Sequence, residues 1–135
     1  KKVHMNDFDN NLDTSVTVVD GCLIVTLPND ITDSDMEIGG KMILMRANRS
    51  SIKGVILDFS MISIVDSYTF SVFEKISKSL LFMGVTVIWI GLKPGVVSAL
   101  VDLNVDVSKI TAAVNLEEAL NIISNPKLNM SRGNS

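Results

Sequence analysis

Two short apolar runs separated by a helical pattern constrain this chain most strongly. Residues 55–57 and 85–90 form runs that are apolar on both faces, which is typical of strands buried inside a sheet. Apolar positions between them recur at spacings of four and three, which predicts an amphipathic helix. The expected buried stripe of this helix comprises Thr69, Phe73, Ile76, Leu80 and Met83. A helix that joins two such strands favours a parallel pair, so the pattern predicts an α/β domain.

The first third of the chain predicts a hairpin followed by a helix. Two β-type runs, 16–19 and 23–27, are separated by Asp20-Gly21, a typical two-residue turn. Thr32 is then a candidate helix cap, with acidic residues after it in the first turn. The pair Gly39-Gly40 lies inside this helix and has two interpretations. The glycines either allow close approach of a neighbouring element or are simply tolerated.

The last third predicts a short helix, an edge strand and a final helix. Pro94 suits the first position of the short helix, and Ala112-Ala113 is the expected edge strand. Asn115 and Glu118 have the spacing of a capping box at the start of the final helix. The expected buried stripes are Val97, Leu100 and Val101 in the short helix, and Leu116, Ala119, Leu120 and Ile123 in the final one.

The length of 135 residues suits one domain, which is expected to span residues 15–125. Residues 1–14 are expected to form an arm and residues 126–135 a flexible tail. Met5 is a candidate natural start, which would make residues 1–4 a remnant of cloning. The uninterrupted apolar runs are shorter than the roughly 20 residues of a membrane helix. A net charge of −3 offers no basic surface for nucleic acid, and the single cysteine fits a reducing compartment.

A polar pair, Asp66-Ser67, lies between the first buried strand and the amphipathic helix. Ser67 is expected at the helix start, where unpaired backbone N–H groups and the helix dipole favour an anion such as a phosphate. The same place suits a plain helix cap, and either Ser67 or Asp66 can be that cap. The residues alone therefore leave a phosphorylation site and a structural cap as alternatives.

The sequence holds no recognisable pattern for catalysis or metal binding. It has no cluster of histidine, cysteine and carboxylate at metal-ligand spacing, no nucleophile elbow and no P-loop. Asp58 ends an apolar run as the phosphoacceptor of a receiver domain does. However, the acidic pair that would hold magnesium after the first strand is missing. The sequence thus predicts a non-enzymatic protein with no cofactor and no metal.

Three segments carry a resemblance to a known family. Leu57-Asp58-Phe59-Ser60, Ile64-Val65-Asp66-Ser67 and Gly91-Leu92-Lys93-Pro94 resemble the core of the STAS domain, the family that includes bacterial anti-sigma factor antagonists. The resemblance runs from about Val16 to Ile123. It implies the STAS fold, an α/β fold with a mixed central β-sheet and helices packed mainly on one face. Tyr68, directly after the serine, is more similar to the RsbS-type stressosome scaffold proteins than to SpoIIAA-type antagonists.

The resemblance also implies a function. Ser67 would be phosphorylated by a GHKL-type serine kinase and reset by a type 2C phosphatase. The protein would be a cytoplasmic bacterial antagonist or stressosome scaffold in stress-response signalling. It would capture that kinase and associate with paralogous STAS proteins and with its own copies, but not with nucleic acid or membrane. The expected switch and partner-binding residues are Asp58, Ser60, Ser63, Asp66, Tyr68, Thr69 and Lys93.

Other interpretations of these residues and of the domain stay open. Ser60 and Ser63 also suit plain turn positions, and Lys93 suits a solvated lysine. The alternative for the whole domain is a ligand-binding or transporter-associated STAS module without a kinase switch.

Overall fold

The computed structural model describes residues 16–49, 51–104, 106 and 110–125. The expected arm and tail lie outside these residues. The described chain forms a five-stranded sheet whose spatial order, β1-β2-β3-β4-β5, is also the order along the chain. The first two strands pair antiparallel and all later neighbours pair parallel, so the sheet is mixed. The strands are β1 (Val16–Val19), β2 (Cys22–Thr26), β3 (Gly54–Asp58), β4 (Thr86–Ile90) and β5 (Ala112–Ala113).

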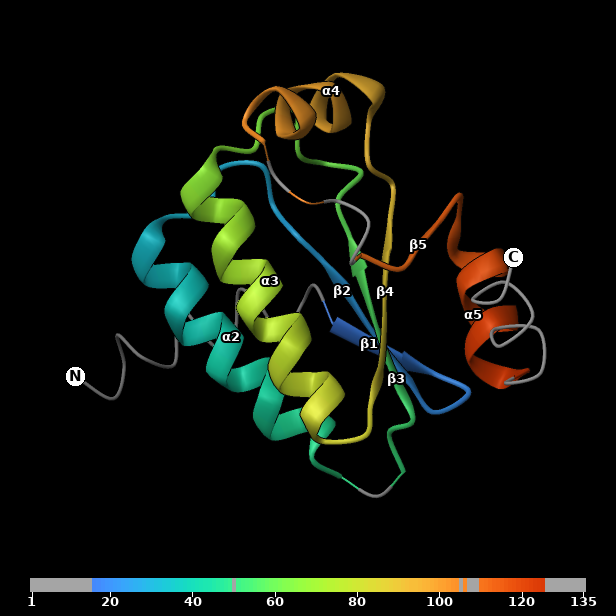
Figure 1. Cartoon of the computed structure of the whole chain (residues 1–135). Helices are drawn as coiled ribbons and strands as arrows, with labels where there is room; N and C mark the ends of the chain where they lie inside the picture. The colour runs from blue at the N-terminus through green and yellow to red at the C-terminus, as the bar shows by residue number, and fades with distance from the viewer. Residues whose placement is uncertain (1–15, 50, 105, 107–109, 126–135) are drawn as a thin grey trace.

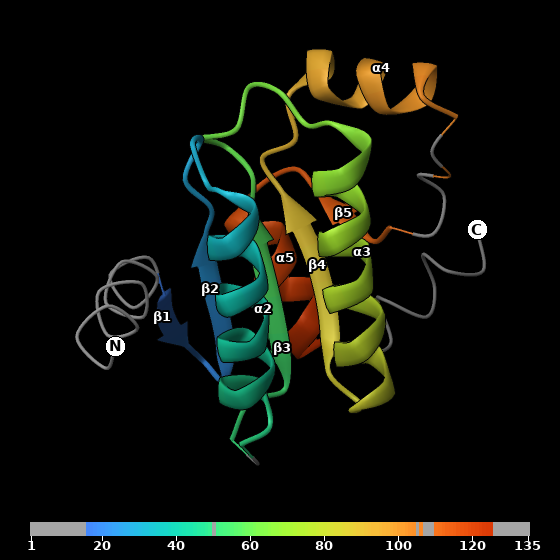
Figure 2. The same ribbon diagram turned by 90° about the vertical axis from the view of Figure 1, so that its left-hand side faces the viewer.

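Four helices connect and cover the strands. They are α2 (Asp33–Ala47), α3 (Ser67–Phe82), α4 (Pro94–Asp102) and α5 (Leu116–Ser124). In Figure 2, α2 and α3 lie side by side over one face of the sheet, and α5 lies behind it. Figure 1 shows α4 beyond the upper end of the strands. The predicted α/β fold, with a mixed sheet and helices mainly on one face, is confirmed.

The two faces of the sheet have separate cores of different size. Alternate residues of β3 divide between them, since Val55 and Leu57 face α2 and α3 whereas Ile56 faces α5. The larger core contains the buried side chains of α2 and α3. The smaller one contains Cys22, Ile24, Ile56, Ile88, Ile90, Ala119, Ile122 and Ile123. Burial on both faces explains why β3 and β4 are apolar along almost their whole length.

Local sequence signals account for the turns and the helix starts. Asp20 and Gly21 both have positive φ, 51° and 77°, as a two-residue hairpin turn requires. Thr32 caps α2 in a capping box with Asp35. Asn115 caps α5 by accepting the N–H of Glu118 at 2.9 Å. In a capping box, the Glu118 carboxylate would accept the backbone N–H of the cap residue, Asn115. Here it accepts the N–H of Val114, the residue before the cap, also at 2.9 Å.

A close contact between α2 and α3 explains one of the paired glycines. A Cβ atom on Gly40 would lie 2.9 Å from Cδ1 of Ile76, which is closer than side chains normally approach. Gly40 therefore lets the two helices pack closely, as one of the two interpretations of Gly39-Gly40 expects.

The predicted buried stripes are partly wrong in register. In α3, Phe70 is buried where Thr69 was expected, and Met83 is an exposed C-cap. In α4, Val96 and Leu100 are buried, whereas Val97 and Val101 are exposed. In α5, Ile122 is buried and Leu116 is exposed.

Candidate functional site

The candidate site lies at the carboxyl edge of the parallel strands. Thr26, Asp58 and Ile90 are register partners, so β2, β3 and β4 end level with one another. The loops that follow, residues 27–32, 59–66 and 91–93, therefore lie together at one end of the sheet (Figure 1). The carboxyl edge is the usual place for binding sites in open α/β sheets. We call residues 59–66 the switch loop.

The switch loop is anchored by every third side chain. Phe59, Ile62 and Val65 are buried, whereas the residues between them point outward. The exposed residues of the loop are Ser60, Met61, Ser63, Ile64 and Asp66. A turn hydrogen bond from the Ile62 N–H to the Phe59 carbonyl, 2.9 Å long, sets the path between the first two anchors. The loop thus presents polar and apolar side chains from a fixed backbone.

Buried aromatic rings lie directly beneath the switch loop. We call Phe59, Phe70, Phe73 and Trp89 the aromatic floor; all four are buried. Phe59 meets Phe73 edge-on at 5.4 Å and Trp89 at 4.6 Å between ring centroids, and Phe70 meets Trp89 at 5.5 Å. Such pairs add to the stabilisation from burial. The expectation that Phe73 lies on the buried stripe of its helix is confirmed, and its ring contacts Phe59 of the switch loop.

Asp58 has a backbone-turn role at the start of the loop. Its side chain is partly buried, and Oδ1 accepts the N–H of Ser60 at 2.9 Å. The next strand allows this turn because Gly91 passes close beside it with φ of 75°. A Cβ atom at Gly91 would lie 2.8 Å from the Ser60 nitrogen and 2.9 Å from Asp58 Oδ1. The carboxylate therefore fixes the start of the switch loop.

Asp66, and not Ser67, caps α3. Its Oδ1 accepts the N–H of Thr69 at 2.7 Å, and its carbonyl accepts the N–H of Phe70 at 3.0 Å. The hydrogen bonds from Thr69 lower the pKa of the Asp66 carboxyl, because they favour its charged form. Of the two candidate caps, the structure selects Asp66. Because Ser67 is not needed as the cap, its hydroxyl is available for modification.

Ser67 is the first residue of α3 and is exposed. Its backbone N–H and that of Tyr68 have no acceptor inside the helix, as is general for a helix start. Tyr68 is 46% exposed beside it, and Thr69 is half-buried and donates its N–H to the Asp66 cap. The position can therefore be reached by another protein, and it offers donors to an anion.

Two further loops contact the switch loop. Asn29, in the loop after β2, accepts the N–H of Ser63 through Oδ1 at 3.1 Å. Lys93, at the N-cap of α4, places Nζ 3.5 Å from the Ser63 hydroxyl. Asn29 was not among the residues predicted for the site from the sequence. Its position after Pro28 at the end of a parallel strand was the available signal, because such strand ends share one edge.

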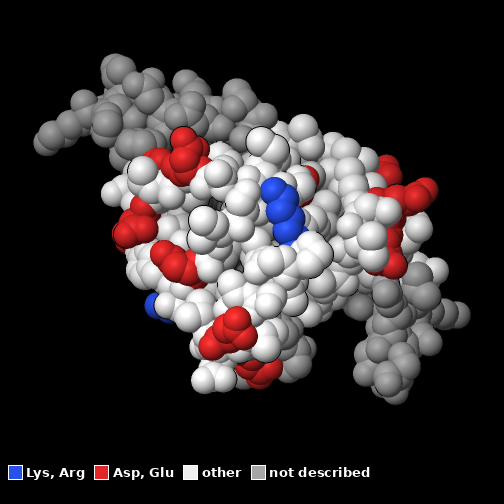
Figure 3. All heavy atoms as spheres, turned by 90° about the horizontal axis from the view of Figure 1, so that it is seen from above, with Lys and Arg blue, Asp and Glu red and all other residues white. Residues whose placement is uncertain are grey.

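The surface around Ser67 combines few charges with exposed apolar side chains. Ile64 is 84% exposed, and Met61 and Tyr68 are also exposed. On α4 and just after it, Val97, Val101 and Leu103 are exposed as well. Figure 3, which views this end from above, shows one basic side chain near the centre of a mostly uncharged area, with acidic side chains toward its margin. Exposed apolar groups gathered in this way are typical of a protein-binding surface.

Within the described ranges, the titratable side chains form no cluster of three or more that could hold a metal ion. No helix there is both long and apolar enough to cross a membrane.

A sequence model of the STAS domain matches residues 13–119. The chain therefore belongs to the STAS domain family. No curated protein matches the chain significantly by sequence.

Solved structures with the same fold include regulatory proteins. A serine-to-glutamate variant of RsbS from Moorella thermoacetica has a TM-score of 0.73 and 23% identity, covering 83% of this chain and 95% of its own. A chain of the stressosome, described as a signal integration and transduction hub, has a TM-score of 0.70 and 24% identity, covering 83% and 97%. The anti-sigma factor antagonist SpoIIAA in its unphosphorylated form has a TM-score of 0.63 and 16% identity, covering 80% and 92%. At these identities the likeness shows the shared fold.

Proposed function

We propose that this protein is a non-enzymatic binding switch that captures a serine kinase. Phosphorylation of Ser67 then releases the kinase. The observation that carries the proposal is the exposed Ser67 at the first position of α3, next to a cap that Asp66 already provides. The serine can be modified without loss of the helix start. The likeness to RsbS and SpoIIAA structures supports the same role.

The switch loop supplies the binding surface in this proposal. Met61, Ile64 and Tyr68 are exposed apolar side chains close to Ser67 in the chain, and the buried anchors hold the loop backbone in place. A preformed surface loses little conformational freedom when a partner binds. Lys93 adds a cation that already contacts Ser63 across the loop.

Phosphorylation would act on this surface through charge. A phosphoserine carries about −1.5 to −2 charge at neutral pH. The Asp66 carboxylate beside it is held in its charged form by Thr69, so the modified site would combine two anionic groups at a partner interface. Repulsion and the cost of desolvating these charges would weaken binding of the kinase.

The wider role follows the RsbS-type and SpoIIAA-type resemblance. The kinase is of the GHKL type, a type 2C phosphatase removes the phosphate, and paralogous STAS proteins or further copies assemble with the chain. Within the proposal, the protein is a cytoplasmic bacterial regulator of a stress-response pathway, either a simple antagonist or a stressosome scaffold. Asp58, Ser60 and Asn29 shape the switch loop, whereas Ser63, Tyr68, Thr69 and Lys93 contact or border the partner.

The test combines mass spectrometry with a capture assay. The purified chain is incubated with a GHKL-type kinase from the same organism and ATP, and peptide mapping locates the phosphate. We expect one phosphate on Ser67, none on Ser67→Ala, and kinase capture by Ser67→Ala but not by the phosphorylated chain. Ser98→Ala, an exposed serine in α4, is the matched control and should behave as wild type. Full phosphate incorporation in Ser67→Ala would contradict the proposal, because the phosphate would then lie on another residue. A wild-type chain that takes up no phosphate and captures no kinase would favour a STAS module without a kinase switch.

A further inference from the structure

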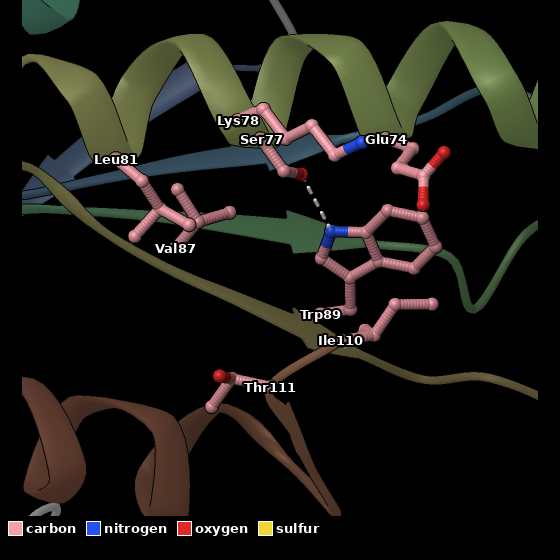
Figure 4. Close-up of a pocket in the computed structure, with 8 residues that line it drawn as sticks. All are labelled: Glu74, Ser77, Lys78, Leu81, Val87, Trp89, Ile110 and Thr111. Atoms are coloured by element: carbon pink, nitrogen blue, oxygen red, sulfur yellow. Dashed lines mark hydrogen bonds between the residues drawn. The ribbon is translucent and has the colours of Figure 1, made fainter. Parts of the chain in front are cut away.

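We propose that a groove between α3 and the edge of β4 binds a small uncharged aromatic molecule of about two fused rings, and that its occupancy is felt by the switch loop. The groove is lined by α3, by β4 and by the segment that leads into β5. Ser77 and Leu81 belong to the α3 wall, Val87 and Trp89 of β4 form the base, and Ile110 and Thr111 form the far side (Figure 4). None of these residues belongs to the switch loop, so the site is separate from the loop.

The groove exists because β5 is short. β5 pairs only with Trp89 and Ile90, which leaves the first part of β4 without a strand on its outer edge among the described residues. Val87, in that part of β4, is nonetheless buried, whereas Leu81 of α3 is 59% exposed. A hollow with a buried base and a partly exposed wall therefore remains where a longer β5 would lie.

Hydrogen bonds within the protein fix the base of the groove. The Trp89 Nε1–H donates to the Ser77 hydroxyl at 3.0 Å, as Figure 4 shows, and that hydroxyl donates to the Phe73 carbonyl at 2.8 Å. The indole N–H thus has its acceptor before any ligand binds. A preformed hollow of this kind favours an apolar occupant, with polar contacts restricted to its rim.

The size and the base of the groove favour an aromatic occupant. Its volume is about 220 Å³. Engineered apolar cavities of about 150 Å³ take up benzene, so this groove has room for a second fused ring. The base contains the indole of Trp89, and aromatic rings gain from stacked or edge-on contact beyond the burial of their area.

The rim selects against a charged occupant. It carries one acidic and one basic side chain, Glu74 and Lys78, one helical turn apart on α3. Their opposite charges give neither an anion nor a cation a net attraction. Thr111, on the far side, is exposed, and its hydroxyl oxygen can accept a hydrogen bond from a ligand N–H. These features fit an uncharged fused-ring molecule with one N–H group, for which indole is the simplest probe.

Trp89 connects the groove to both ends of the switch loop. Its ring lies 4.6 Å from that of Phe59 and 5.5 Å from that of Phe70, between centroids. Phe59 begins the loop, and its carbonyl accepts the N–H of Ile62. Phe70 donates its N–H to the carbonyl of Asp66, where the loop ends. An occupant packed against Trp89 restricts this ring and, through it, the loop. The link concerns the loop itself, so it can be tested without the proposed kinase.

Binding can be measured at the groove directly. Trp89 is the only tryptophan of the chain, so its indole N–H gives a unique signal in a proton–nitrogen NMR spectrum. Titration of the labelled full chain with indole should move this signal with a dissociation constant below about 1 mM. Octanoate has an acyl chain and a carboxylate in place of the rings, and it should bind at least about 10-fold more weakly. A signal that indole does not move, or octanoate binding as tight as indole, overturns the proposal.

A filled groove tests whether the site is the one described. Thr111→Phe places a ring at an exposed position of the lining and should raise the dissociation constant for indole at least about 10-fold. Val114→Phe adds the same ring at an 81% exposed position outside the lining and should leave the constant unchanged. Melting temperatures confirm that both variants fold. If Thr111→Phe does not fold, Leu81→Ala, which shortens an exposed wall, should raise the constant at least about 3-fold. Wild-type affinity in a folded groove variant overturns the proposal.

Amide hydrogen exchange tests the link to the switch loop. Saturation with indole should slow exchange of the Ile62 N–H, which bonds to the Phe59 carbonyl, at least about 3-fold. The Lys53 N–H, which donates to the Gly21 carbonyl at the opposite end of the sheet, is the control and should exchange at an unchanged rate. An Ile62 rate that indole leaves unchanged, or equal slowing at both amides, overturns the link. Because no kinase is present, either result leaves the proposed phosphorylation of Ser67 to its own test.

Discussion

The switch loop and the aromatic floor meet at Phe59 but differ in almost every physical property. The floor consists of buried rings in mutual contact, and the loop consists largely of exposed side chains held by three anchors. Under the proposed function, the difference teaches that stability and partner binding depend on different residues of one short segment. A change among the exposed side chains of the loop would then alter binding without lowering stability, whereas a change among the buried rings would lower stability.

The largest expected effect is on the floor. Phe73→Ala removes a ring that is 2% exposed and packs edge-on against Phe59. Its free energy of unfolding should fall by about 3–5 kcal/mol, measured by urea denaturation. Phe82→Ala removes the same side chain from an exposed site of the same helix and should change the unfolding free energy of the monomer by less than about 0.5 kcal/mol. An equal loss of unfolding free energy in Phe73→Ala and Phe82→Ala would show that the aromatic floor is no more important for stability than an exposed surface position.

A second substitution acts where the loop and the next strand touch. Gly91→Ala forces a Cβ atom against the Ser60 nitrogen and places a non-glycine residue at φ of 75°. Backbone strain of this kind costs about 1–3 kcal/mol, so the melting temperature should fall. Gly95→Ala is the control, because a Cβ atom there meets nothing within 4 Å and the position is helical. Its melting temperature should stay the same or rise slightly.

The contribution of the Asp66 cap of α3 to stability should depend on pH. The lowered pKa of Asp66 means that its charged form is favoured by folding, so its contribution is present at neutral pH and is lost as the pH falls through the folded-state pKa. Asp66→Ala should lower the melting temperature at neutral pH. Asp66→Asn keeps a hydrogen-bond acceptor but cannot titrate, so it should retain more of its neutral-pH stability in acid than wild type does. Identical acid profiles for wild type and Asp66→Asn would show that the carboxylate has no such role.

The smallest effect should be at Ser67 itself. Because Asp66 provides the cap, Ser67→Ala should change the free energy of unfolding by less than about 0.5 kcal/mol. Thermal unfolding followed by circular dichroism measures this change. A fall as large as that of Gly91→Ala would mean that the serine belongs to the stabilising region and not to the exposed one.

Most of the fold could be predicted from periodicity and turn chemistry. The apolar strands β3 and β4, the Asp20-Gly21 turn and the caps of α2 and α5 all rest on local signals that the structure confirms. The buried faces of the helices were less predictable. In α4 several neighbouring residues are apolar, so spacing alone cannot distinguish Val96 from Val97. In α3, Thr69 and Phe70 both have a helical spacing to Phe73.

At the site, the sequence indicated which residues come together but not their hydrogen bonds. The parallel strand ends bring Asp58, Ser67 and Lys93 to one edge, and this follows from the topology. The turn bond of Asp58 to Ser60 and the contact from Asn29 depend on loop geometry that no periodicity specifies. The choice of Asp66 over Ser67 as cap depends on where the first helical turn begins, a difference of one residue.

The identity between strand order and chain order has a consequence during synthesis. Each strand that leaves the ribosome can pair with the strand made just before it, so the sheet can grow by addition at one edge. The second face is different, because its cover, α5, comes after every strand. Until Leu116–Ser124 is made, Ile24, Ile56 and Ile88 form a bare apolar surface of the kind through which incomplete chains aggregate. The nine residues of α5 therefore decide whether a nascent chain becomes a protected domain.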